Sequence, residues 1–221
     1  MIDEKNEPSA GSATLFQMLA RGLTCPDAAM VEAIEDGSFA AEVGELLACM
    51  PFSESLAERV ERSLEDLSCT IGDPDFLGGL RREYTRLFSA PRGALVPPWE
   101  TLFLNADEDA PEFGSVLIRS KEAADARNRY EAAGVSLALQ ESADHMRLEC
   151  EFAGYLCSRL AQAMQPESRQ VWARHLDGFV HAHLDRWFAA FFDTLAANAR
   201  HPFYRTIAAL GESVKLDACR C

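Results

Sequence analysis

Two short stretches of the chain combine residue types that could bind or react with a ligand. In the first stretch, Pro97 and Pro98 are followed by Trp99 and Glu100. The two prolines fix two φ angles and remove two N–H donors, which predicts neither a helix interior nor a central strand at this point. A stiff loop would present an indole ring beside a carboxylate, and this arrangement suits a peptide with basic character. The alternative is that Trp99 fills the core where a loop returns to a helical bundle.

The second stretch contains Glu141, Asp144 and His145 at the head of the longest helical pattern, which runs from Glu141 to Met164. The spacing i, i+3, i+4 would place all three side chains on one side of the helix, in a first turn where the helix dipole favours carboxylates. Asp144 and His145 could form an acid–base pair. An enzyme would also need a nucleophile or a metal, and no neighbour supplies one by its spacing, so helix capping is the favoured interpretation.

His181 and His183 form the best candidate for a metal cluster. On a helix, residues i and i+2 point apart, so we predict that the two imidazoles do not share an ion. A surface pair of His181 with Asp177 or Asp185 explains this pattern better. The chain also lacks the glycine-rich signatures of phosphate and dinucleotide binding. We therefore predict neither a metal nor a resident cofactor.

The chain has seven cysteines without any CxxC spacing, which favours a reducing compartment over a disulfide framework. Cys150 and Cys157 lie two turns apart on one predicted helix, as packing residues do. Cys219 and Cys221 could bind a metal or oxidise, although a frayed terminus is the favoured interpretation. The polar N-terminal segment does not resemble a signal peptide, and no apolar run approaches the roughly 18 residues that span a bilayer. These features predict a cytoplasmic protein.

The charge of the chain restricts its partners. Its 221 residues carry a formal net charge of -14. This charge argues against nucleic acid or an anionic membrane as a partner, and it allows a cationic one.

The elements that carry both stretches are predicted to be helices, since we find no convincing strand, hairpin signal or internal repeat. The fold expected is all-α, a single globular bundle of roughly nine or ten helices. Residues 1–11 are predicted to form a flexible tail and 12–217 the helical domain. The irregular segment 90–119 is predicted to be a long connection across the bundle, or a hinge between two halves. Starts of helices are predicted near Ser12, Pro26, Phe39, Ser53, Pro74, Ser120, Glu141, Glu167 and Pro202.

The two stretches belong to a larger pattern. Tyr84, Leu87 and Phe88 fall at i, i+3, i+4 and are followed by Pro91 and then by the run Pro97-Pro98-Trp99-Glu100-Thr101. The second group is Glu141-x-x-Asp144-His145, and the run Pro202-Phe203-Tyr204 opens the last predicted helix. In order and separation these groups resemble the TorD/DmsD family of cytoplasmic chaperones, the redox-enzyme maturation proteins, which show Y-x-x-L-F-x-G-P, P-P-x-E-S and E-P-x-D-H.

The resemblance extends from about Leu15 to Val214, with three departures. Ala90 stands where the family usually has Gly, Thr101 where it has Ser, and Ser142 where it has Pro. Thr101 keeps the hydroxyl group, and Ser142 can still cap a helix. Ala90 removes the residue that tolerates a left-handed turn.

The resemblance implies an all-α protein that is not an enzyme. Such a chaperone binds the twin-arginine signal peptide of a molybdenum-cofactor oxidoreductase of the DMSO/TMAO reductase type. It holds the apoenzyme while the cofactor is inserted and delays export until the enzyme is folded. Members of the family occur as monomers and as domain-swapped homodimers. Some are linked to guanine nucleotide, for which this chain has no recognisable loop.

The residue types agree with such a role, because a peptide with two arginines and an apolar stretch needs carboxylates beside an apolar or aromatic groove. We predict that an apolar wall is formed in part by Leu87, Phe88, Pro98 and Trp99. Carboxylates of Glu100, Glu141 and Asp144 would receive the arginines, and His145 would orient one of them. The alternative is that the same residues only pack the Pro-Pro-Trp segment onto the long helix. The full set of predicted peptide-binding residues is Tyr84, Leu87, Phe88, Pro97, Pro98, Trp99, Glu100, Thr101, Glu141, Asp144 and His145.

Three other interpretations stay open. A NarJ-type chaperone would serve a membrane-bound nitrate reductase or a related enzyme whose peptide lacks a functional export signal. A small acid–base enzyme would use Asp144 and His145 and would need a closed pocket. A plain helical interaction module would bind no client peptide.

Overall fold

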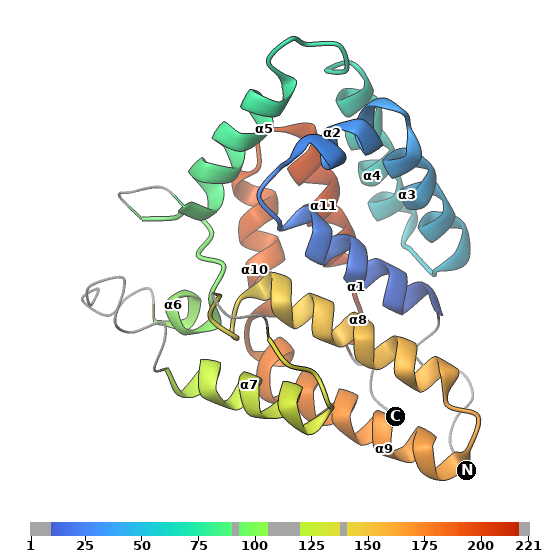
Figure 1. The fold of residues 1–221 in the computed structure, drawn as a ribbon. Helices are drawn as coiled ribbons and strands as arrows, with labels where there is room; N and C mark the ends of the chain where they lie inside the picture. Colours follow the sequence, from blue (N-terminus) through green and yellow to red (C-terminus); the bar gives the residue numbers. More distant parts are fainter. Residues whose placement is uncertain (1–9, 90–92, 106–119, 138–140, 217–221) are drawn as a thin grey trace. The chain divides into compact units, whose positions relative to one another are not determined.

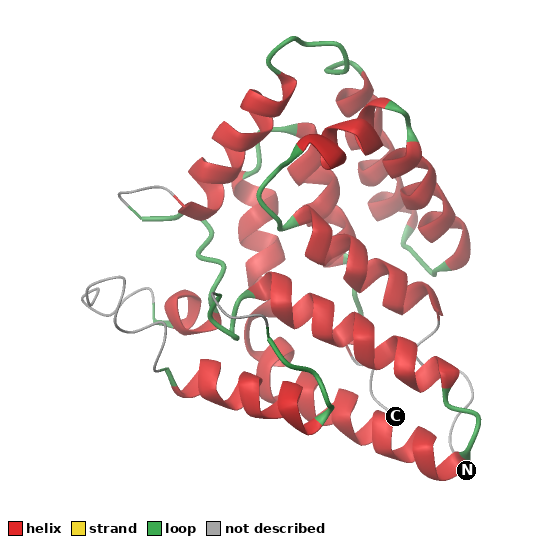
Figure 2. Ribbon diagram, viewed as in Figure 1, coloured by secondary structure: helices red, strands yellow, loops and turns green. Residues whose placement is uncertain are grey.

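The computed structural model describes residues 10–89, 93–105, 120–137 and 141–216. Within these ranges the regular structure is helical, and the one pairing of extended backbone is an isolated antiparallel bridge between Trp99 and His145 (Figure 2). The prediction of an all-α fold is confirmed. None of the described helices combines the length and the apolar character that crossing a bilayer requires.

The chain divides into two compact units, whose helices are labelled in Figure 1. The first unit takes Met1–Arg21, Pro98–Ala189 and Lys215–Cys221, so it draws on three separate segments of the sequence. Its helical elements are α1 (Ala10–Gly22) as far as Arg21, α6 (Glu100–Leu104), α7 (Lys121–Ala132), α8 (Met146–Gln162), α9 (Pro166–Phe179), η3 (Val180–Leu184) and the first turn of α10 (Asp185–Asn198).

The second unit takes Gly22–Pro97 and Ala190–Val214. The boundary between Pro97 and Pro98 falls within the segment 90–119 that the sequence suggested as a hinge, and hinge motion stays a prediction. The helical elements of this unit are α2 (Ala28–Glu35), α3 (Ser38–Cys49), α4 (Glu54–Ser68), α5 (Phe76–Tyr84), η1 (Thr85–Ser89), the remainder of α10, and α11 (Pro202–Glu212).

Several predicted helix ends are confirmed. Ser120 caps α7, because its Oγ accepts the N–H of Ala123 at 3.0 Å. Gly134 follows this helix with a φ of 79°, a left-handed conformation that favours glycine. Pro202 is the first residue of α11, where its missing N–H costs no hydrogen bond.

Other predicted helix starts were wrong. Ser12 lies inside α1, which already begins at Ala10. The predicted tail 1–11 is therefore helical at its last two residues, while residues 1–9 lie outside the described ranges. Asp27, not Pro26, precedes α2, since its carboxylate accepts the N–H of Met30 at 2.9 Å. The long helix α8 begins at Met146, the first residue of its predicted apolar stripe and five residues after the predicted start at Glu141.

Two segments of π-helix interrupt the α-helical runs. η1 continues α5, and η3 joins α9 to α10. A π turn adds a residue to the helical turn and so changes which side chains face the core, and such turns often occur at functional sites. Leu87 and Phe88 of η1 and His183 of η3 are all buried.

The core of the first unit is aromatic. Tyr130 of α7, Phe152 of α8 and Phe179 of α9 meet with ring centroids 4.5 to 5.9 Å apart. On α8, Gly154 allows close approach of α1, because a Cβ there would lie 3.2 Å from the carbonyl oxygen of Ala13. These contacts hold the helices from which the functional side chains project.

In the second unit, the start of α11 is tied to α5 by a carboxylate. Glu83 pairs with Arg86 at 2.8 Å and accepts the backbone N–H groups of Arg200 and His201. Burial opposes ionisation of Glu83, but the Arg86 guanidinium and the two N–H donors outweigh it and lower the pKa of this carboxyl to about 2. The neighbouring Phe88 packs on Tyr204 of α11, with centroids 5.9 Å apart.

Two helical glycines of the second unit predict opposite effects of the same substitution. A Cβ at Gly211 of α11 would overlap the buried ring of Phe192, whereas one at Gly44 of α3 would meet no atom within 4 Å. Gly211→Ala should lower the free energy of unfolding by about 1–3 kcal/mol through overpacking. Gly44→Ala should raise it by up to about 1 kcal/mol because alanine favours the helix. Urea unfolding followed by circular dichroism measures both, and equal effects would contradict this account.

Candidate functional site

The two predicted stretches meet in the first unit and are joined through their backbones. The N–H of Glu100 donates to the carbonyl of Asp144 at 2.9 Å, and the N–H of Met146 donates to the carbonyl of Pro98 at 2.8 Å. These bonds flank the bridge between Trp99 and His145. We call this pairing the latch, defined as Pro98–Thr101 with Asp144–Met146.

Side chains reinforce the latch. The Asp144 carboxylate accepts the N–H and the hydroxyl of Thr101, at 3.1 and 2.5 Å, and also the hydroxyl of Ser142. Asp144 is fully buried, so these donors replace the water that its carboxylate would otherwise need. The half-buried indole of Trp99 meets the His145 ring edge to face, with centroids 5.4 Å apart.

Glu141, Asp144 and His145 do not share a helical turn, which corrects the prediction of one helical side. They precede α8, and His145 is its N-cap, since its Nδ1 accepts the N–H of Arg147 at 3.0 Å. The hydrogen bonds of Asp144 go to Thr101 and Ser142, so the geometry shows capping and not an acid–base pair. Burial lowers the pKa of His145 to about 4, despite the opposing charge of Asp144.

Glu100 lies in the segment 90–119, which was expected to be irregular with one or two short helical turns. It is the first residue of such a turn, the short helix α6, and is fully buried. Its Oε1 accepts Nη1 of Arg186 at 2.6 Å, and its Oε2 lies 2.8 Å from Nδ1 of His183. The other ring nitrogen of His183 lies 3.0 Å from Oδ2 of Asp125. Both nitrogens of this buried imidazole therefore face carboxylate oxygens.

A second buried carboxylate, Glu149 of α8, completes this group. Its Oε2 accepts the indole N–H of Trp187 at 3.0 Å. Its Oε1 is buried without a hydrogen-bond partner and lies 3.9 Å from Nδ1 of His183. Burial raises the pKa of Glu149 well above its usual range, and the nearby charge of Glu100 raises it further, while the bond from Trp187 opposes both.

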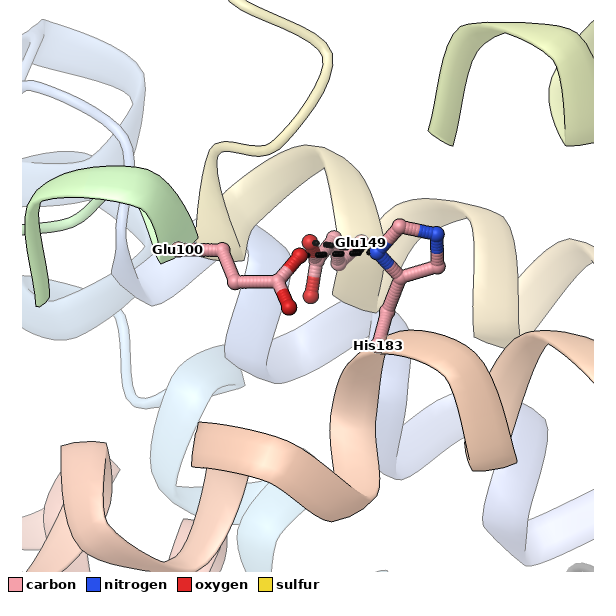
Figure 3. A group of neighbouring side chains, drawn as sticks. All are labelled: Glu100, Glu149 and His183. Carbon is pink, nitrogen blue, oxygen red and sulfur yellow. Dashed lines mark hydrogen bonds and ion pairs between the residues drawn. The ribbon is translucent and has the colours of Figure 1, made fainter. Parts of the chain in front are cut away.

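These side chains include a possible metal-binding set. Among the described residues, one ligand atom each from Glu100, Glu149 and His183 lies within 4.8 Å of the other two (Figure 3). The prediction that His181 and His183 point apart is confirmed, because the side chain of His181 is 82% exposed and that of His183 only 1%. His181 pairs with Asp185 at 3.6 Å, which confirms the predicted surface pair.

Four predicted residues belong to the second unit. Leu87 and Phe88 are buried in it, and the carbonyl of Leu87 accepts the N–H of Val96 at 2.9 Å. Tyr84 and Pro97 are half-buried there. Their role in binding a peptide stays a prediction.

The first unit contains a half-open pocket of about 400 Å³. Two of its lining residues, Glu141 and Arg147, lie on either side of the latch segment Asp144–Met146 in the sequence. Arg147 at its rim forms ion pairs with Glu141 and Glu151, and the three side chains are 22%, 46% and 62% exposed. The rim thus has two carboxylates and one guanidinium. Apart from Ser136, the rest of the lining is apolar or aromatic and consists of Tyr130, Val135, Leu137, Leu148, Phe152 and Tyr155.

The sequence reasoning missed Glu149, Asp125 and Arg186. A usable signal was present at Glu149, which is three residues after Met146 and seven before Leu156, both part of the stripe predicted to be buried. A carboxylate on a buried face needs a partner from another element. No local spacing identifies that partner, since Glu100 and His183 are distant in sequence.

A comparison with family models places the chain in one family, and a solved structure has a similar fold. The family model described as "Nitrate reductase delta subunit" matches residues 53–193. A protein from Archaeoglobus fulgidus assigned to redox enzyme maturation has a similar solved structure, with a TM-score of 0.51 and 20% sequence identity over 92% of this chain and 91% of that one. At this identity the likeness concerns the fold. A search of curated protein sequences found no significant match.

The cap on α8 predicts a pH dependence of stability. The pKa of His145 is about 4 when folded and 6.5 for an ordinary histidine, so the unfolded chain takes up a proton first as the pH falls. The contribution of His145 to the free energy of unfolding should be fully present above pH 6.5. It should fall by about 3 kcal/mol as the pH approaches 4. His145→Asn keeps a capping acceptor and should remove this part of the decline.

Urea unfolding of both proteins across this pH range measures the difference. The same replacement at exposed His181 is the matched control and should leave the decline as in the parent protein. A parallel decline in the parent and in His145→Asn would show that the buried imidazole does not cause it.

Proposed function

Because the chain belongs to the nitrate reductase delta subunit family, whose members are redox-enzyme maturation chaperones and not catalysts, we propose that it binds the signal peptide of its client oxidoreductase. The client proposed is a molybdenum-cofactor enzyme of the DMSO/TMAO reductase type with a twin-arginine signal peptide. The chaperone holds the apoenzyme for cofactor insertion before export. Such a role places it in the cytoplasm, as a monomer or a domain-swapped homodimer.

One observation in the first unit carries the proposal, namely the half-open pocket with an acidic rim. Apolar side chains of a signal peptide would fill the floor near Leu148 and Tyr155. A peptide guanidinium would take the place of Arg147 between Glu141 and Glu151. Guanidinium–carboxylate pairs are strong and directional, so this exchange would favour arginine over neutral residues.

The latch supports this pocket, in our proposal, by fixing the residues that lead into α8. Trp99 and Pro98 would limit the movement of the chain before Arg147, while Thr101, Asp144 and His145 hold the turn in place. Glu100 would contribute indirectly, because its buried bonds to His183 and Arg186 hold the residues next to Trp99 in place. Tyr84, Leu87, Phe88 and Pro97 stay candidate peptide contacts of the second unit.

A second candidate function is that of a NarJ-type assembly chaperone for a membrane-bound nitrate reductase. The description of the matching family, nitrate reductase delta subunit, favours it. Such a client peptide would lack a functional twin-arginine signal. The pocket would then bind mainly the apolar part of that peptide.

Calorimetric titration with three peptides tests the proposal. The first is a twin-arginine signal peptide of an oxidoreductase encoded nearby, the second has both arginines replaced by Gln, and the third is the N-terminal peptide of a nitrate reductase catalytic subunit. Saturable binding of the first peptide, weakened in the second, is the expected result. Preference for the third peptide would favour the NarJ-type function, and binding of none would contradict recognition of a client N-terminus.

A double-mutant cycle assigns the arginine contact to the pocket rim. Glu141→Gln should weaken binding of the twin-arginine peptide about 3- to 10-fold, because an exposed charged contact contributes about 0.5–1.5 kcal/mol. The peptide without arginines should bind the variant and the parent equally. Glu58→Gln, a change of an exposed carboxylate on α4, is the matched control and should have no effect. An equal loss with both peptides would assign Glu141 to structure instead.

A further inference from the structure

We propose that Glu100, Glu149 and His183 bind a divalent first-row transition-metal ion such as Zn²⁺. The ligand atoms would be Oε2 of Glu100, Oε1 of Glu149 and Nδ1 of His183. This inference does not depend on the proposed function.

The three ligand atoms converge from three elements of the first unit, α6, α8 and η3 (Figure 3). Nδ1 of His183 lies 2.8 Å from Glu100 Oε2 and 3.9 Å from Glu149 Oε1. A tetrahedral zinc ion with bonds of about 2.0–2.2 Å separates its ligand atoms by about 3.3–3.6 Å. The two observed distances lie on either side of this range, so each would need to change by about 0.5 Å or less to reach it.

The unpartnered oxygen of Glu149 is an independent sign of a missing ligand. Its Oε1 is buried and accepts no hydrogen bond, and it points toward the imidazole. A buried polar atom without a partner costs free energy, and such groups in folded proteins often mark an ion or water site. A cation between Oε1 and Nδ1 would satisfy the carboxylate and remove this cost.

Each ligand is also held at its other polar atom. Arg186 binds Oε1 of Glu100 at 2.6 Å, and the Trp187 indole binds Oε2 of Glu149 at 3.0 Å. Asp125 lies 3.0 Å from Nε2 of His183. With an ion bound at Nδ1, the N–H at Nε2 would donate to this carboxylate. Outer partners of this kind orient the ligands of metal sites and fix the tautomer of a metal-binding histidine.

The two carboxylates of the group also favour a divalent cation. Buried Glu100 and Glu149 both face Nδ1 of His183. A divalent ion at this point would offset the repulsion between the two carboxylates. One imidazole and two carboxylates suit Zn²⁺, Mn²⁺ or Fe²⁺ better than the softer ions that prefer thiolates.

Titration of the metal-free full-length protein with Co²⁺ tests this site, because its visible spectrum reports coordination. The expected result is one ion per chain with no near-ultraviolet thiolate-to-cobalt band, and displacement by Zn²⁺. Glu149→Gln should weaken binding at least tenfold while keeping an oxygen that can accept the Trp187 N–H. Asp125→Asn changes a partly exposed outer residue and should weaken binding about tenfold or more.

His181→Gln serves as the matched control, since this exposed histidine lies two residues from the proposed ligand. It should leave the affinity unchanged. Absence of binding, a thiolate band, or the same affinity in Glu149→Gln would overturn the proposal. Circular dichroism of each variant establishes that it is folded before it is compared.

Discussion

The buried carboxylate of Glu100 is the constraint on which the arrangement of the first unit depends. An ionised group without water must find compensating charge and hydrogen bonds, or folding loses several kcal/mol. Glu100 meets this need with Arg186 and His183, from the helical run that follows α9. Its own backbone N–H is fixed by Asp144. These bonds fix the positions of helix α6, the latch and η3 relative to one another.

The run through η3 and α10 supplies the compensating groups. Within η3, His181 points to solvent and His183 to the core. His183, Leu184 and Trp187 are all buried from this one run. The family resemblance at Tyr84–Phe88 coincides with the other π segment, η1. A π turn thus occurs in each of two groups of candidate residues, and the peptide-binding role of Tyr84, Leu87 and Phe88 stays a prediction.

The sequence predicted the helical class and many helix ends, because apolar periodicity, proline and capping serine act locally. It also indicated that Trp99–Glu100 and Asp144–His145 belong together, through a resemblance and not through spacing. It did not predict where α8 begins, since Glu141, Asp144 and His145 suit a first helical turn but lie in a turn that Thr101 holds. Nor did it predict Glu149 with His183, because the energy of a buried polar group depends on partners distant in sequence.

The composition of the first unit from three separate segments has a consequence for synthesis of the chain. Phe16 of α1 is synthesised long before its aromatic partner Phe188. Until Phe188 is made, α1 can meet α8 at Gly154, but the core around Phe16 is incomplete. The unit can therefore complete its packing only after the segment Pro98–Ala189 has been synthesised. A protein proposed to bind an unfolded enzyme thus itself passes through a stage in which part of α1 is not yet packed.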